Sequence, residues 1–338
     1  MTTLSPTLHR ALAHVGSLRS ALALIGLLGI VALLRPSAPL LGAVFALLGA
    51  NLLAALVVHP LLRRRLPLLV FHLALLAVVL LAGLGRLTRL DGRFELLQGE
   101  AFDGQLLDQD AGALYLPRLQ RLAFRNDGFE IDYAPGRRRG ATRNAVSWVD
   151  AEGVARRIVI GDHRPLVIEG HRFYTSSNKG YAPVLRWQAA TGGEPVRGAV
   201  HLPSYPMHEL RQSREWTLPD GRSLWLQLQT DDTPIATDAP ARFRLPDAHR
   251  LVLRLGEARI ELQPGQAWVV DGGTLVYEGL RTWMGYRVSH DPTLPWLLAA
   301  SLLAAFSLAW HYARTFTARD AAPAGTALAA RSAGVTHA

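Results

Sequence analysis

The stretch PLLVFHLALLAVVLLAGLG, residues 67–85, decides the fold class of this chain, because it is apolar over its whole length except for His72. About 20 apolar residues at helical rise cross the hydrocarbon core of a bilayer, so the stretch predicts a transmembrane helix. Hydrocarbon offers no hydrogen-bond partner to an imidazole. His72 must therefore find its partner in another helix, in a cofactor or in water.

Three further segments have the same character, and we expect transmembrane helices at residues 17–35, 39–58 and 293–313 as well. Residues 17–35 could instead be a secretory signal, because their apolar part is short. Two more hydrophobic helices follow at once, however, which favours a retained helix that sets their direction. Residues 1–16 are then a cytoplasmic N-terminus, and residues 314–338 are predicted to be a disordered cytoplasmic tail.

Arginines predict the orientation of the chain. The loop between the second and third spans contains Arg63, Arg64 and Arg65, whereas the loop after the first span contains only Arg35. Short positively charged loops stay on the cytoplasmic side. The long segment 86–291 is therefore predicted to be extracytoplasmic.

Residues 86–291 predict an all-β domain. Runs such as AVSWVDAEGVARRIVIG (145–161) and HRLVLRLGEARIELQPG (249–265) are strand-like, with turn residues between them. Short strands with such punctuation are typical of an antiparallel sandwich or an open barrel. The predicted fold class is a membrane protein with four transmembrane α-helices and a large extracytoplasmic all-β domain between helices 3 and 4.

Composition excludes several classes of function. The chain has no cysteine, so it has no disulfide, no thiolate metal site and no C-x-x-C-H haem attachment motif. The net charge is +9, but the basic residues are scattered and almost all arginine, so we do not expect nucleic-acid binding. No paired-carboxylate, Ser-His-Asp or phosphate-loop pattern is present. A catalytic role of the chain's own side chains is therefore not indicated.

His72 has one candidate partner within the chain. Asn51 lies in the second span, which runs in the opposite direction, at a similar depth. The same span has a stripe of small residues that permits close helix approach, at Gly42, Ala46, Ala50 and Ala54. An Asn51–His72 hydrogen bond could be structural only, or it could orient an imidazole whose other nitrogen binds a metal, as in haem ligation. The composition leaves both alternatives open, and His59 and His311 at the span edges are expected to be interfacial.

Three stretches resemble the ResB (also called CcsB) family of System II cytochrome c biogenesis. Residues 44–92 are similar to its second and third spans, including the asparagine and the Phe71–His72 pair. Residues 277–314 are similar to its closing strand and last span. The external segment 161–187 is similar through Pro165, Leu166, Gly170, Phe173, Tyr174, Ser176, Ser177 and Gly180. The loop RPSAP (35–39) is shorter than is usual in the family, and Thr293 follows Pro292 where the family has glycine.

The resemblance implies a subunit of a membrane cytochrome c synthase in the bacterial inner (plasma) membrane. Such a subunit works with a CcsA/ResC-type partner to conduct non-covalently bound haem b outward to apocytochrome c, as a non-catalytic or accessory part of a haem lyase complex. His72 matches the family's transmembrane haem-iron ligand, and Asn51 would support it. Arg86 and Arg89 could contact haem propionates, although interfacial anchoring is the simpler role. The alternative is a cofactor-free, membrane-anchored scaffold or assembly factor.

Overall fold

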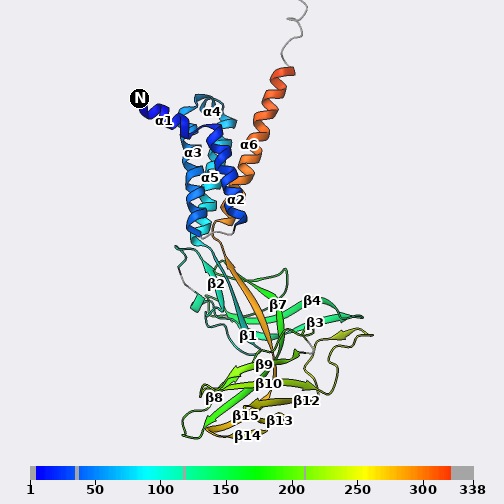
Figure 1. Cartoon of the computed structure of the whole chain (residues 1–338). Helices are drawn as coiled ribbons and strands as arrows, with labels where there is room; N and C mark the ends of the chain where they lie inside the picture. Colours follow the sequence, from blue (N-terminus) through cyan, green and yellow to red (C-terminus); the bar gives the residue numbers. More distant parts are fainter. Residues whose placement is uncertain (1–4, 35–37, 117–118, 209–210, 321–338) are drawn as a thin grey trace, which may run out of the picture. The chain divides into compact units, whose positions relative to one another are not determined.

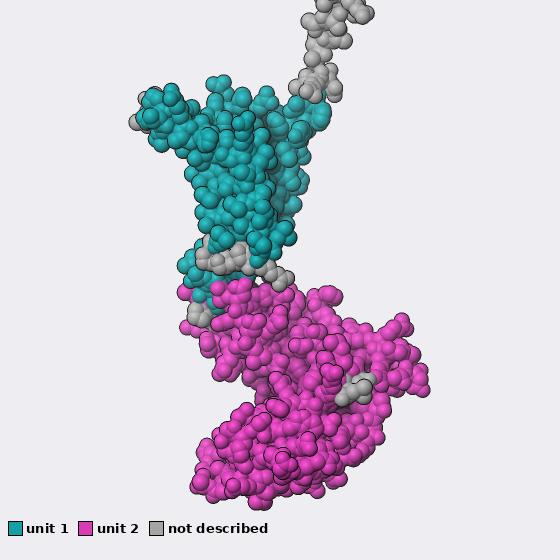
Figure 2. Space-filling model, in the orientation of Figure 1, with its two compact units in different colours: residues 1–89, 112–115, 291–338 teal, residues 90–111, 116–290 magenta. Residues whose placement is uncertain are grey.

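The structure is a computed structural model of the chain, and it describes residues 5–34, 38–116, 119–208 and 211–320 (Figure 1). Two compact units make it up (Figure 2). We call residues 1–89, 112–115 and 291–338 the helical unit, and residues 90–111 and 116–290 the β unit.

The helical unit is built from helices of very different lengths. They are α1 (Pro6–Val15), α2 (Leu18–Leu33), α3 (Ala38–Val58), α4 (Pro60–Arg64), α5 (Leu66–Thr88) and α6 (Leu294–Asp320). Among the described residues, α3, α5 and α6 are long and apolar enough to cross a membrane. α2 reaches that length only together with α1, as one span bent by 42°. Three of the four predicted membrane helices are therefore present as long apolar helices.

Both ends of the helical unit differ from the prediction. Residues 1–16 were expected only as a terminus, but they contain α1, whose first turn is capped by the Ser5 side chain. The disordered tail predicted from residue 314 is wrong for residues 314–320, because α6 continues to Asp320. This segment contains no glycine or proline to end the helix. Residues 321–338 and most of the RPSAP loop (35–37) lie outside the described residues.

Small residues allow the helices to approach closely. Val31 of α2 packs with Val44 and Leu48 of α3. At the far end of α5, a Cβ on Gly85 would lie 2.6 Å from Thr293 Oγ1, so only glycine permits this contact. Thr293 in turn donates its backbone N–H and its hydroxyl to one carboxylate oxygen of Asp291, at 2.9 and 2.7 Å. The threonine that departs from the family pattern is thus bonded to the Asp291 carboxylate in the turn before α6.

In the β unit, every strand pair among the described residues is antiparallel. The strands are β1 (Leu90–Leu97), β2 (Asp108–Ala111), β3 (Arg125–Ala134), β4 (Arg138–Val149), β5 (Ala155–Ile160), β6 (Leu166–Ile168), β7 (His171–Ala189), β8 (Val196–Ala199), β9 (Ser213–Thr217), β10 (Ser223–Thr230), β11 (Ala241–Arg242), β12 (His249–Leu255), β13 (Ala258–Leu262), β14 (Ala267–Val270) and β15 (Gly273–His290), with a 3-10 turn at Leu119–Arg121. The hairpins β4–β5 and β12–β13 confirm the two strand pairs predicted from 145–161 and 249–265.

Three sheets organise the β unit. The largest has the order β2-β1-β15-β7-β6, with β14 beside β15 and β8 beside β7. The other two have the orders β13-β12-β10-β9 and β11-β3-β4-β5. The long strands β7 and β15 pair from Gly273–Ala189 to Ser289–Arg172 with two register shifts. One hydrophobic core cluster joins residues of all three sheets, among them Ile131, Leu185 and Leu226.

Candidate functional site

His72 lies in the second turn of α5, and its side chain is half-buried within the chain. Its Nδ1 is 2.7 Å from the carbonyl oxygen of Leu68, one turn earlier in the same helix. A carbonyl oxygen only accepts hydrogen bonds, so Nδ1 is the donor and Nε2 is the ring nitrogen left for another partner. The ring of Phe71 meets the imidazole edge-on, with 5.2 Å between centroids. His72 is thus held by its own helix through Nδ1, and Nε2 makes no hydrogen bond to another described residue.

Asn51 does not support His72, and that prediction is wrong. The Asn51 amide is buried and donates to the carbonyl oxygens of Val15, at 2.5 Å, and Ser17, at 3.4 Å. These carbonyls lie where α1 ends and α2 begins, and the carbonyl of Ser17 also accepts the backbone N–H of Ala21 at 3.1 Å. Depth along the helix predicted that Asn51 could reach His72, but depth carries no information on which neighbour the side chain faces.

The His72 geometry fits a haem-iron ligand. Metal-ligating histidines commonly donate their second ring N–H to a carbonyl or a carboxylate, which fixes the tautomer and the ring orientation. Within the described ranges, no group of three or more His, Asp or Glu side chains could hold a bare metal ion. Haem iron, by contrast, takes only its axial ligands from protein, and a single histidine supplies one of them.

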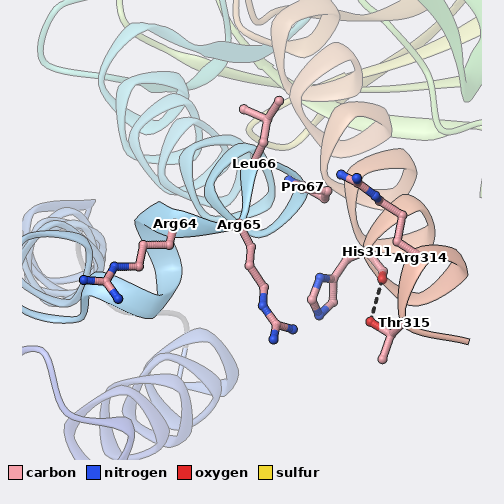
Figure 3. Close-up of a pocket in the computed structure, with 7 residues that line it drawn as sticks. All are labelled: Arg64, Arg65, Leu66, Pro67, His311, Arg314 and Thr315. Carbon is pink, nitrogen blue, oxygen red and sulfur yellow. Dashed lines mark hydrogen bonds between the residues drawn. The ribbon is translucent and has the colours of Figure 1, made fainter. Parts of the chain in front are cut away.

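A cavity of about 610 Å³ opens near the start of α5 (Figure 3). Arg64 and Arg65 come from α4 and the junction with α5, whereas His311 and Arg314 come from α6. The side chains of Arg65 and His311 extend into the same space (Figure 3). The remaining lining residues are Leu66, Pro67 and Thr315, so no acidic side chain of the described chain lines this cavity. The arrangement can accept an anionic group.

The sequence predicts an interfacial position for His311, but it does not predict that His311 lines a cavity. Residues 65 and 311 are far apart in the sequence, and only the antiparallel packing of α5 and α6 brings them together. The arginine triplet Arg63–Arg65 is the sequence feature that could have indicated an anion-binding cavity, but the charge pattern predicts only membrane topology.

Arg86 and Arg89 lie at the other end of α5. Arg86 is half-buried in the last turn, and its Nε has no hydrogen-bond partner among the described residues. The backbone of Arg89 caps the helix by donating to Gly85 O at 2.9 Å. Fourteen residues separate Arg86 from His72, or about 21 Å of helix, which is much farther than propionates extend from haem iron. These arginines therefore cannot contact the propionates of a haem ligated by His72.

A sequence profile of the ResB-like family matches residues 62–316. The chain belongs to the ResB-like family. Membership implies involvement in cytochrome c biogenesis, and the long apolar helices agree with a membrane protein. The matched range of this ResB-like chain includes His72, the β unit and most of α6, but not Asn51. No curated protein matches the sequence.

Proposed function

We propose that this ResB-like chain is the haem-holding subunit of a membrane cytochrome c synthase. It holds haem b non-covalently through His72 and, with a CcsA/ResC-type partner, passes it to apocytochrome c. The observation that carries the proposal is the hydrogen bond from His72 Nδ1 to Leu68 O, which leaves Nε2 as a ligand inside an apolar helix. An intramembrane ionisable side chain is a functional group by default.

The low burial of α5 and α6 within the chain supports the proposal that a partner chain packs on them. Of the most apolar 18 residues of α5, 11% are buried within the chain, and the same share holds for α6, compared with 33% for α3. His72 supplies one axial ligand, so a second subunit packed on α5 can supply the other. The haem would then lie between subunits, where its apolar ring meets apolar helices.

The arginine-lined cavity supports uptake of haem at the same end of the helices as His72. Arg65 precedes His72 by seven residues, which is about 10 Å along a helix. Haem carries two propionates, and arginine pairs with carboxylates through charge-assisted hydrogen bonds. Arg64, Arg65, Arg314 and His311 would hold the propionates while the iron approaches His72.

The orientation is part of the same proposal. Arg63, Arg64 and Arg65 favour the cytoplasmic side of a bacterial inner membrane for the loop between α3 and α5. The β unit is then extracytoplasmic, where it meets apocytochrome c, and α1 with α2 forms the first of four spans. The scaffold alternative depended on His72 as a link between helices, and the bond within α5 removes that support.

Cytochrome c maturation in cells that depend on this chain tests the proposal against the scaffold alternative. His72→Gln retains hydrogen-bonding capacity but is a poor iron ligand, so we expect loss of holocytochrome c and of haem co-purifying with the complex. His59→Gln is the matched control, because His59 lies outside the long helices, ahead of α4, and it should leave both unchanged. Normal maturation with His72→Gln at normal protein levels would contradict haem ligation and support the scaffold.

A further inference from the structure

A second cavity, of about 360 Å³, lies within the β unit. Strands β3, β4 and β7 and the loop after β8 surround it. The side chains that matter for its chemistry are Tyr133, Arg137, Arg139, Lys179, Tyr205 and Met207. Its volume is at the lower end of the range found for small-molecule sites.

Lys179 is the only lysine in the chain, and it is 2% exposed. Its Nζ donates to Thr142 Oγ1 at 3.1 Å, and this hydroxyl also accepts from Arg139 Nη2 at 2.7 Å. An ammonium has three N–H donors, yet in the part of the chain that the structure describes the Nζ of Lys179 makes no other hydrogen bond or ion pair. A buried charge with one neutral acceptor is destabilising by itself. The Lys179 ammonium is therefore a charged donor at the cavity, and the described residues supply an acceptor for only one of its three N–H groups.

Tyr133 supplies a second unused donor. The side chain is 2% exposed, and its hydroxyl has no hydrogen-bond partner in the described residues. Burial raises the pKa of Tyr133 to about 12, so the phenol is neutral and able to donate. Two buried donors from different strands thus line the same cavity.

The charges around these donors select the kind of ligand. Arg139 Nη2, which donates to Thr142, is also paired with Asp162 at 2.8 Å, and no acidic side chain of the described residues lines the cavity itself. Tyr205, Pro206 and Met207 form an apolar wall, and Met207 is 83% exposed. An anion would satisfy the donors, and an attached apolar group would cover the wall.

We propose that this cavity binds a carboxylate carried on an apolar body. The carboxylate accepts from Lys179 Nζ and Tyr133 Oη, and the apolar body lies against Tyr205, Pro206 and Met207. The site is separate from His72 and does not depend on haem ligation. It gives the β unit a recognition function that sequence motifs do not indicate.

The single lysine gives an unambiguous test. In the full-length chain in detergent micelles, lysine labelled with ¹³C at Cε gives one signal, which reports the protonation of Lys179. Burial, with the charge of Arg139, lowers the pKa of Lys179 to about 8 in the free protein. Benzoate is the probe, and benzyl alcohol is its neutral counterpart. We expect benzoate to move the titration midpoint upward, saturably and by about one pH unit or more, because an adjacent anion favours the ammonium; benzyl alcohol should not.

Two matched variants complete the test. Tyr133→Phe removes the second donor and should weaken benzoate binding about fivefold, the value of one hydrogen bond. Tyr277→Phe is the control, because its hydroxyl is also buried without a partner but does not line the cavity. A Lys179 signal that benzoate leaves unchanged would overturn the proposal. Equal weakening by both variants, or an equal response to benzyl alcohol, would do the same.

Discussion

Replacing Lys179 with methionine should stabilise the ligand-free protein at neutral pH. The substitution keeps the length of the apolar stem and removes the buried charge. The pKa of Lys179 falls from 10.5 to about 8 on folding, mainly through burial. At about 1.4 kcal/mol per pKa unit, the buried ammonium costs about 3 kcal/mol below pH 8. Loss of the bond to Thr142 offsets about 1 kcal/mol, so the expected gain at pH 7 is about 2 kcal/mol.

The pH dependence gives the sign of this effect. Between pH 8 and 10.5 the unfolded chain binds more protons at Lys179 than the folded chain does, so the wild-type protein gains stability as pH rises. The advantage of Lys179→Met should therefore be full at pH 7 and mostly gone by pH 10. For a unit of this size, the gain of about 2 kcal/mol at pH 7 corresponds to roughly 4 to 8 °C in melting temperature.

Thermal melts of the full-length chain in micelles, followed by the β-sheet circular dichroism signal, measure this difference. Lys179→Met and wild type are compared at pH 7 and pH 10. A melting-temperature difference that does not change between the two pH values would refute the reasoning, because it would show that the ammonium carries no burial penalty. A variant less stable than wild type at pH 7 would also refute it.

Two further predictions concern residues outside this cavity. Burial and the stacked ring of His290 lower the pKa of His171 below 6.5, so the unfolded chain binds more protons there and stability should fall as pH drops through 6.5. Melts from pH 7.5 to 5 check this, and His171→Phe should flatten the slope; an unchanged slope would contradict it. Asn51→Leu removes the amide donor to the carbonyls of Val15 and Ser17, of which only Ser17 keeps a backbone donor among the described residues, from Ala21, and it should destabilise the helical unit by about 1 to 3 kcal/mol. Haem retention should survive this change, and loss of haem in a folded Asn51 variant would contradict the separation of Asn51 from His72.

The sequence was sufficient to predict a helix or a hairpin where one physical signal dominates. The predicted span 67–85 lies within α5 and the span 39–58 coincides closely with α3, because hydrocarbon thickness and apolar composition fix them. The hairpin at 145–161 was predictable because period-two runs flank a turn. α1 was missed because it is short and mostly exposed, so neither length nor mean hydropathy identifies it.

The parts of the sites that depend on distant partners could not be predicted. Asn51 and His72 have similar depth, but the rotation of α3 directs the amide to the α1–α2 break. Lys179 lies inside the family-like segment 161–187, but nothing in that segment indicates a cavity, and the environment of Lys179 appears only when Thr142 and Tyr133 are placed beside it. His72 could be selected as a candidate from the sequence, because a lone imidazole in an apolar run is conspicuous; its role as a haem ligand stays a prediction.

Chemical rescue of the haem spectrum tests the central claim most directly, that Nε2 of His72 ligates haem iron. The His72→Gly chain, purified together with the proposed CcsA/ResC-type partner, should lose the spectrum of axially ligated haem and regain it when imidazole is added. His72→Phe, which fills the vacated space, should lose the spectrum without rescue. A wild-type spectrum in His72→Gly without imidazole would contradict the account.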